Sequence, residues 1–495
     1  MRCFFPPSHF LWLTLILMVV LGPAGSAQGQ SWSNLGGNGR MNGLSPVAGP
    51  DSASDLAWQG GAPSLIAWPV MSEWRRIFTV RQSAEATAPV STDSTIHALD
   101  VETGVTLWTR DLPRDSGDWT AWIAGVKNGR VYASRSGNGG SVGAPLYCLD
   151  AATGATLWHT AGGNGLPRVL ITGGPYSGAV FAEDGDLIMP SVRTLDRFDA
   201  QTGQRLWSAS RTEQVGNSAG AVIVGNAIYV ADAASGMQVA IRKFDATTGQ
   251  FLHRGPLLTG GLLHNGPLVG IDGRIYLHLT RSESLDYDFL YSFTDTGTAI
   301  VQNWRASSGG GGAFSRWGVG PDGSIYTMSW TGAPHWNNQG RLQRLDPTTG
   351  AVLAESSLIT GDSMLLQMVV DARGVLYVSN GTSGGMEQAR LYSFNADLTE
   401  RWSVPISGNS NLGGPSLCED GTLLLASSGT ELRAYRSTPR CPEDIDGTGD
   451  VDSGDVAFAL LDYRPCPRCS SDLDGSGYVD FGDMALILLA FGPCN

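Results

Sequence analysis

One phrase recurs along most of this 495-residue chain and constrains its fold more than any other feature. An apolar residue, Asp, Thr-Gly and Leu-Trp follow one another at fixed spacing, as in Leu99-Asp100, Thr103-Gly104 and Leu107-Trp108. Further copies begin at Leu149, Phe198, Phe244 and Leu345, and degenerate copies lie near Thr296 and Leu398. A period of 46 to 53 residues in β-rich sequence is typical of propeller blades.

Each part of the phrase has a local physical role. The Asp side chain accepts hydrogen bonds from the amides of a tight turn, and Gly takes a positive φ so that the hairpin closes. The Trp ring returns to a strand, where it can pack between neighbouring blades. An aromatic-rich strand such as Arg130-Val131-Tyr132 precedes each phrase. Short strands separated by turns at regular intervals exclude an α/β fold.

Eight such units lie between Arg76-Ile77-Phe78 and Thr422-Leu423-Leu424. The eighth unit has no Thr-Gly-Leu-Trp strand, and Asp55-Leu56-Ala57-Trp58 supplies a matching strand near the N-terminus. We expect this strand to close the last blade, because closure covers two exposed sheet edges. The sequence therefore predicts an all-β, eight-bladed propeller over residues 51–438, with seven blades as the alternative.

The phrase from Ala98 to Trp108 resembles the tryptophan docking motif of eight-bladed quinoprotein (PQQ) alcohol dehydrogenases. It equally resembles the non-enzymatic propellers of the outer-membrane β-barrel assembly machinery. Both resemblances concern blade architecture and imply fold rather than chemistry. The quinone enzymes carry two adjacent cysteines over the cofactor, whereas Cys148 and Cys418 are solitary here. Bound pyrroloquinoline quinone is therefore not expected.

The N-terminus has the pattern of a targeting segment. Arg2, an apolar run from Leu11 to Leu21 and small residues ending at Ala27 predict a signal peptide over residues 1–27, followed by a linker over 28–50. The apolar run is too short to span a bilayer, so no transmembrane anchor is expected. These features predict a bacterial protein that is secreted or held at the cell-envelope surface.

Most of the net charge of −14 lies in the last 55 residues, where eleven acids face two arginines. No basic patch accompanies it, which disfavours nucleic acid as a partner. Two 12-residue loops 28 positions apart place oxygen side chains at loop positions 1, 3, 5, 9 and 12 and Gly at position 6, the spacing of calcium loops. The loop residues are Asp444, Asp446, Thr448, Gly449, Asp452 and Asp455, and Asp472, Asp474, Ser476, Gly477, Asp480 and Asp483. Two calcium ions are predicted.

An apolar helix is expected after each loop, over residues 456–461 and 484–489. Residues 439–495 thus resemble a dockerin type I module, a small domain of two loop–helix calcium units. The resemblance implies that the Asp450 and Tyr478 carbonyls are further ligands, and that residues 441–495 bind a cohesin-like or other cell-surface protein. Thr448 and Ser476 replace the usual acid or amide, and Ser453-Gly454 and Phe481-Gly482 replace a Ser-Thr pair that contributes to cohesin recognition.

Four cysteines of this module repeat the same 28-residue shift. In an exported protein they favour disulfides, although Cys466 and Cys469 with Cys441 and Cys494 could instead form a zinc site. The pseudo-twofold symmetry of the dockerin-like module implies the pairs Cys441–Cys494 and Cys466–Cys469. Metal and disulfides would supply stability that so small a core lacks.

No catalytic motif can be read from the sequence. Counting back from the aromatic strands places a ring of polar residues at one channel mouth, which suits a glycan or peptide: Tyr176, Asn217, His264, Asn265, Arg316 and Gln367. Solvated loop residues are the simpler interpretation. The favoured function is an exported binding or scaffold propeller tethered through its tail. The alternatives are an extracellular carbohydrate-active enzyme (glycoside hydrolase or lyase) acting on polysaccharide and, third, a quinoprotein dehydrogenase.

Overall fold

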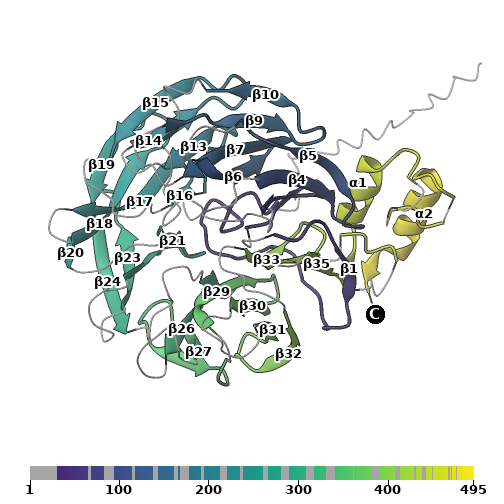
Figure 1. The fold of residues 1–495 in the computed structure, drawn as a ribbon. Coiled ribbons are helices and arrows are strands. Elements are labelled where there is room, and N and C mark those ends of the chain that lie inside the picture. The colour runs from purple at the N-terminus through teal and green to yellow at the C-terminus, as the bar shows by residue number, and fades with distance from the viewer. Residues whose placement is uncertain are drawn as a thin grey trace, which may run out of the picture.

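The protein is a ring of β-sheets with a small helical unit at one side (Figure 1). The computed structural model describes residues 31–494, except 65–67, 83–93, 114–117, 138–142, 161–165, 168–177, 191–193, 212–219, 235–237, 260–265, 280–288, 308–316, 331–339, 360–361, 382–388, 407–412, 428–430, 438–441, 447, 449, 467–468, 470 and 475. The expected signal peptide lies outside the described residues. Within them, no helix is both long and apolar enough to cross a bilayer.

The first four blades each contain four antiparallel strands in chain order from the axis outward. They are β2 (Met71–Glu73), β3 (Arg76–Gln82), β4 (Ser94–Asp100) and β5 (Thr106–Arg110); β6 (Asp118–Lys127), β7 (Arg130–Gly137), β9 (Tyr147–Asp150) and β10 (Thr156–His159); β12 (Val180–Phe181), β13 (Leu187–Pro190), β14 (Thr194–Phe198) and β15 (Arg205–Ser210); and β16 (Ala221–Val224), β17 (Ala227–Ala234), β18 (Gln238–Asp245) and β19 (Phe251–Arg254).

The next three blades follow the same order. They are β21 (Leu268–Val269), β22 (Ile275–Leu279), β23 (Phe289–Asp295) and β24 (Ile300–Ser307); β25 (Gly318–Val319), β26 (Ile325–Trp330), β27 (Gly340–Leu345) and β28 (Val352–Glu355); and β29 (Asp362–Val370), β30 (Leu376–Gly381), β31 (Arg390–Phe394) and β32 (Glu400–Pro405). Small additions are β8 (Gly143–Ala144) paired with β11 (Leu166–Pro167), and β20 (Leu258–Thr259) paired with β18.

The eighth blade is built from both ends of the propeller sequence. It contains β33 (Gly414–Leu417), β34 (Leu423–Ala426) and β35 (Leu432–Tyr435), and its outer strand is β1 (Leu56–Gly60). In the antiparallel β1–β35 pair, Trp58 lies opposite Ala434 and Gly60 opposite Leu432. The predicted closure by the Asp55–Trp58 segment and the count of eight blades are both confirmed.

The repeated turns have the predicted chemistry. The Asp100 Oδ1 atom accepts hydrogen bonds from the Glu102 amide at 3.1 Å, the Thr103 amide at 2.9 Å and the Thr103 hydroxyl at 2.8 Å. Gly104 has a φ of 68°. A Cβ on Gly104 would lie 2.5 Å from the Trp58 ring. Glycine is therefore required both for the left-handed backbone and for the Trp ring that rests on it.

The hydrophobic core lies within and between neighbouring blades. The fully buried Tyr132 and Tyr276 of the second strands have ring centroids 6.0 and 5.9 Å from Trp158 and Trp304 on the outer strands of their own blades. Each outer Trp then reaches the next blade, as Trp158 does when its indole N–H donates to the Ala200 carbonyl at 3.0 Å. The outer Trp thus packs on the core of its own blade and connects that blade to the next one.

Residues 31–50 follow the ring of blades and are largely buried, which differs from the linker expected over 28–50. Their backbone bonds to successive blades: the Ser33, Gly39, Arg40, Asn42 and Val47 carbonyls accept from Val126, Ile223, Val269, Val319 and Ala372 amides. Asn34, Asn38 and Asn42, spaced four residues apart, each accept an amide N–H two residues later. These Asx turns wind the segment around the axis, and their Asn spacing is a signal that could have been recognised in the sequence.

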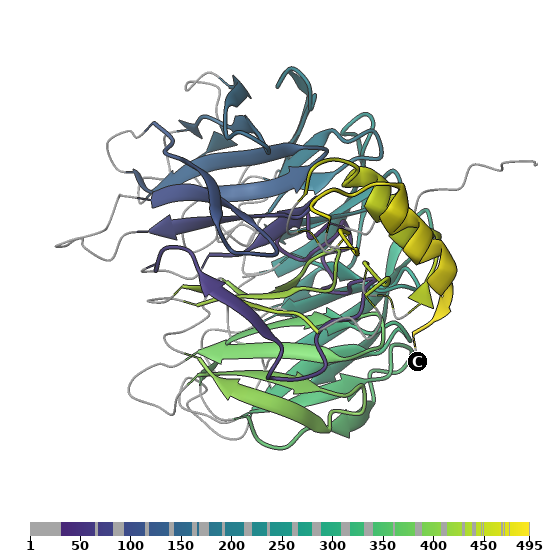
Figure 2. The same ribbon diagram turned by 90° about the vertical axis from the view of Figure 1, so that its right-hand side faces the viewer.

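The C-terminal unit lies beside the propeller, against the turns between first and second strands (Figure 2). It contains β36 (Asp450–Val451), α1 (Ser453–Leu461), α2 (Phe481–Ala490) and β37 (Gly492–Pro493). Arg75, in the β2–β3 turn, pairs with Asp462 at the end of α1 and with Glu102 of its own blade. Asp462 also accepts from the Ser471 hydroxyl at 2.7 Å, so one carboxylate connects both halves of the tail to blade 1.

Candidate metal centres

The two tail helices begin in the same way because the sequence repeats after 28 residues. Asp452 caps α1 by accepting from the Gly454 amide at 2.6 Å, and Asp480 caps α2 by accepting from the Gly482 amide at 2.7 Å. Asp455 and Asp483 complete a capping box in each first turn. Each loop is therefore fixed to the helix that follows it.

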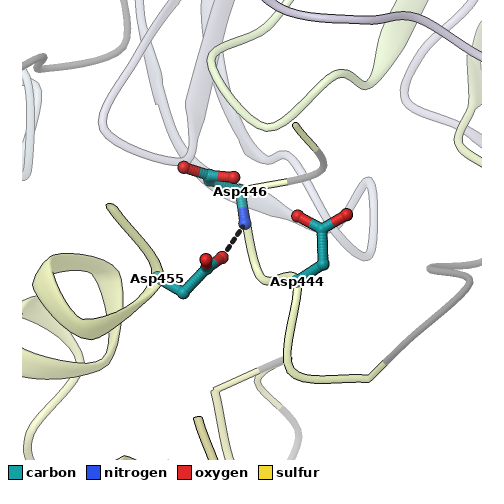
Figure 3. A group of neighbouring side chains, drawn as sticks. All are labelled: Asp444, Asp446 and Asp455. Carbon is teal, nitrogen blue, oxygen red and sulfur yellow. Dashed lines mark hydrogen bonds between the residues drawn. The ribbon is translucent and has the colours of Figure 1, made fainter. Parts of the chain in front are cut away.

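In the first loop, Asp444, Asp446 and Asp455 converge (Figure 3). One ligand atom from each lies within 4.8 Å of the others. The fully buried Asp455 accepts through Oδ1 from the amides of Ile445 at 2.6 Å and Asp446 at 3.0 Å. Two oxygens bound to one Ca²⁺ at 2.3–2.6 Å lie at most about 5 Å apart, so this triad is compact enough to share one ion.

The second loop repeats this arrangement with Asp472, Asp474 and Asp483. Asp483 Oδ1 accepts from the Leu473 amide at 2.7 Å and the Asp474 amide at 3.2 Å. Asp472 Oδ1 is shielded from solvent and accepts no hydrogen bond within the protein. A buried carboxylate oxygen without a donor is costly, and a cation would satisfy it.

Like charges crowd the first triad. The pKa of Asp446 is raised to about 6, chiefly by burial; hydrogen bonds from Thr448 oppose this rise, and the neighbouring carboxylates of Asp455 and Asp444 contribute to it. A divalent cation would reverse this balance, because it neutralises the charges that repel one another. Both acidic triads could therefore bind metal ions.

The other predicted ligands form hydrogen bonds within the loops themselves. Thr448 Oγ1 donates to the Asp450 carbonyl at 3.1 Å, and Ser476 Oγ donates to the Tyr478 carbonyl at 3.0 Å. The Asp452 and Asp480 side chains serve as helix caps. Among the described residues, the structure thus groups the acids of loop positions 1, 3 and 12, and leaves positions 5, 7 and 9 bonded to neighbouring loop atoms.

The two units interlock across a pseudo-twofold axis. Strand β36 of the first loop pairs with β37 after the second helix, opposing Asp450 to Pro493, while Tyr478 of the second loop bridges to Pro465 after the first helix. Cys466 and Cys469 form a disulfide. Cys494 is also disulfide-bonded, and its expected partner Cys441 lies outside the described residues. A free ring of four thiolates for zinc is therefore not available.

The predicted channel-mouth site falls almost entirely outside the described residues, which exclude Tyr176, Asn217, His264, Asn265 and Arg316. Gln367 is described, and it is 1% exposed within β29. Sequence reasoning also gave no sign of Arg75, whose role depends on the tail folding back onto blade 1. His253, which replaces a repeat Trp, has its Nε2 3.1 Å from Asp295 Oδ1 in the next blade.

Comparisons with known proteins agree with this architecture. A family model described as outer membrane protein assembly factor BamB matches residues 92–270. A 124-residue stretch is 32% identical to the quinohemoprotein alcohol dehydrogenase of Comamonas testosteroni, covering 23% of this chain and 17% of that enzyme. The match thus spans less than a fifth of the relative's length.

Two solved structures share the fold over most of the chain. The crystal structure of the Comamonas testosteroni enzyme gives a TM-score of 0.52 at 13% identity, covering 82% of this chain and 80% of the other. A europium-containing methanol dehydrogenase gives 0.53 at 12% identity, covering 81% and 90%. At sequence identities of 13% and 12%, the similarity shows a shared fold and nothing further. With its eight four-stranded blades and repeated Trp contacts, the chain is an eight-bladed β-propeller, and its residues 92–270 are similar to the BamB family.

Proposed function

We propose that this protein is an exported, calcium-binding propeller, and that residues 441–495 tether it to a second protein at the bacterial cell surface. The propeller then acts as a binding or scaffold module. The observation that carries this proposal is the pair of acidic triads, repeated at a 28-residue shift in two loops that each cap a helix.

Calcium is the metal that the donor set favours. All six side chains of the two triads are carboxylates, and hard oxygen donors select Ca²⁺ over softer transition metals. The buried, unbonded Oδ1 of Asp472 supports an ion in the second loop. The same spacing and helix placement support the dockerin-like nature of the tail.

An exposed apolar surface on the tail supports tethering to a protein. Leu460 and Leu461 at the end of α1 are 54% and 64% exposed, and their counterparts at the 28-residue shift, Leu488 and Leu489, are 59% and 85% exposed. Phe481, at the start of α2, is 75% exposed. Apolar side chains gathered in this way mark interaction sites, because burying them in a partner removes them from water.

The tail differs from an ordinary dockerin at the loop positions that contribute to cohesin recognition. A Cβ on Gly454 would lie 2.5 Å from the Asp446 carboxylate, and a Cβ on Gly482 would lie 3.0 Å from the Asp474 carboxylate. A Thr at either place would crowd an acid of the metal triad. This close approach explains why glycine occupies both positions. It favours a cohesin-like partner whose binding surface differs from that of an ordinary cohesin, or another surface protein.

A quinone-dependent oxidation fits the residues poorly. The resemblance to quinoprotein dehydrogenases implies adjacent cysteines above the cofactor, but Cys148 lies in β9 of blade 2 and Cys418 follows β33 of blade 8. Both thiols are buried. We therefore assign no oxidation step to the protein.

The proposal is tested by capture from the envelope of the source bacterium. Full-length protein on a resin, with calcium, should retain a surface protein that a calcium chelator releases. A variant with Asp455→Asn and Asp483→Asn should not retain it, whereas Glu443→Gln, an acid just before the first loop, should behave as wild type. Equal capture by the double variant, or capture insensitive to chelator, would refute tethering through a metal-dependent tail.

A further inference from the structure

A cavity of about 510 Å³ lies between the N-terminal segment and the turns at the ends of the inner strands of four blades. Its wall contains turn residues from four successive blades: Val224 and Gly225, Ile271, Pro321, and Ala372. Residues between Asn38 and Pro46 of the winding N-terminal segment form the remainder. Pockets of this size accommodate small organic ligands or the end of a peptide.

Among the described residues that line this cavity, Arg40 has the one charged side chain. Its Nη1 donates to the Gly270 carbonyl at 2.5 Å, which fixes the guanidinium and leaves its other N–H groups for a ligand. Among the described residues, Arg40 forms no ion pair. The neighbouring asparagines are already used, since Asn38 Nδ2 donates to Asn42 Oδ1 at 2.8 Å and Asn42 Nδ2 donates to the Val269 carbonyl at 3.0 Å.

Three acids next to lining residues of the cavity each pair with an arginine of their own blade. Asp272 follows the lining residue Ile271, Asp322 follows Pro321, and Asp371 comes just before Ala372. These acids pair with Arg274, Arg344 and Arg373, in that order. None of these acids is left to pair with Arg40. The cavity therefore presents one uncompensated positive charge to an entering group.

The rest of the wall is partly apolar. Leu44, Pro46, Ile223, Ile271 and Pro321 supply its apolar surface, and Ile271 is 44% exposed. A single cation beside an apolar part of the wall favours a singly charged anion on a hydrophobic body over a multiply charged phosphate. A planar carboxylate can also accept two parallel N–H bonds from one guanidinium.

We propose that this cavity binds an apolar carboxylate, with its charged group on Arg40 and its hydrophobic body against Ile271, Ile223 and Leu44. Two sources share this chemistry, a peptide C-terminus with apolar side chains and a medium-chain fatty acid. The site is independent of the metal loops and of the tethering role.

Isothermal titration calorimetry of the full-length protein tests the proposal with four probes. N-acetyl-Ala-Val-Leu and octanoate carry the free carboxylate, and the amides of the same two compounds are neutral controls. We expect at least one acid to bind with a Kd below about 1 mM and its amide to bind at least tenfold more weakly. The acid that binds identifies the source as peptide or lipid.

Variants separate the site from general effects. Arg40→Gln should weaken binding of the acid at least tenfold, while Arg40→Lys should retain part of it. Ile271→Glu changes an exposed rim residue, keeps Arg40 and should abolish binding by charge repulsion. Arg205→Gln, on the outer strand β15, serves as a control and should bind as wild type does. Circular dichroism of each variant checks that the fold is retained.

The proposal is overturned if neither acid binds at millimolar concentration, or if the amides bind as well as the acids. It is equally overturned if folded Arg40→Gln and Ile271→Glu proteins both retain wild-type affinity. Because no metal contributes, binding should persist in chelator. A failure of chelator-sensitive capture through the tail would leave these titrations unchanged.

Discussion

The indole N–H of Trp58 donates a hydrogen bond to the carbonyl oxygen of Val101, 2.8 Å away in the neighbouring blade. Trp58 lies on β1, the strand that completes blade 8, so this bond joins the last blade to the first. The same contact recurs around the ring, with Trp108, Trp158, Trp207 and Trp304 donating to carbonyls of the blades that follow theirs. Closure therefore uses the contact that holds the blades together elsewhere.

Replacing Gly104, which lies beneath the Trp58 ring, should show how much the free energy of unfolding depends on this contact. Gly104→Ala forces a Cβ to 2.5 Å from the Trp58 ring at a positive φ, and we expect it to lower the free energy of unfolding by about 2–4 kcal/mol. Gly297→Ala also has a positive φ but meets nothing within 4 Å, because His253 replaces the Trp, and it should cost about 1 kcal/mol. Urea unfolding measures both; equal losses would mean that backbone strain alone requires these glycines.

Metal removal should affect the tail alone. If both triads hold calcium, titration of chelator-treated protein should give two bound ions, and Asp455→Asn should give one. Asp455 also accepts backbone amides from Ile445, Asp446 and Asp452, so its loss should lower the tail's thermal stability as well. Calorimetric scanning with and without calcium checks this prediction. Two ions bound to the Asp455→Asn protein would contradict it.

One buried acid should make the protein less stable as the pH rises from about 4.5 to 8. Burial, and then the charge of Glu73, raises the pKa of Glu419 to about 8. In the unfolded chain this acid ionises near pH 4.5, so between about pH 4.5 and 8 the folded state holds more protons and loses stability as pH rises. Glu419→Gln should therefore stabilise by on the order of 1 kcal/mol at pH 8.5 and by little at pH 5.

Urea unfolding at the two pH values measures this difference, and Glu400→Gln on the exposed β32 strand is the matched control. A Glu419→Gln effect that is the same at pH 5 and pH 8.5 would show that ionisation of this group is not what changes stability.

Arg75 should hold the tail against blade 1. Trp74 and Arg75 both have positive φ, 55° and 63°, in a turn where other blades place glycine, and such strain is retained where the side chain has a role. Arg75→Ala removes the ion pair with Asp462. We expect hydrogen exchange in residues 453–461 to quicken severalfold, with Arg433→Ala unchanged. Unaltered exchange in the Arg75→Ala protein would mean that other contacts hold the tail.

The propeller could be predicted from the sequence because its information is local and repeated. The Asp100 turn and the Gly104 conformation depend on a few neighbouring residues, and the same phrase at a regular period leaves few folds available. The orphan strand at Trp58 could be placed for the same reason, since only one blade was incomplete. The two helices expected over 456–461 and 484–489 are present, but each begins three residues earlier, at Ser453 and Phe481, because the loop residues Asp452 and Asp480 cap them.

Long-range neighbours could not be predicted. The Asn34–Asn42 segment resembles a linker by composition, and only the ring of inner strands supplies the amides that its carbonyls accept. The pairing of Arg75 with Asp462 joins residues 387 positions apart.

By itself, then, the sequence determined the blades, their number and the acids of the two loops, because period and spacing act over a few residues. Tertiary structure alone decided which surfaces remain open: the cavity lined by Arg40 and the exposed leucines of the tail. Exposure depends on which distant segments cover a residue, and no local pattern records that.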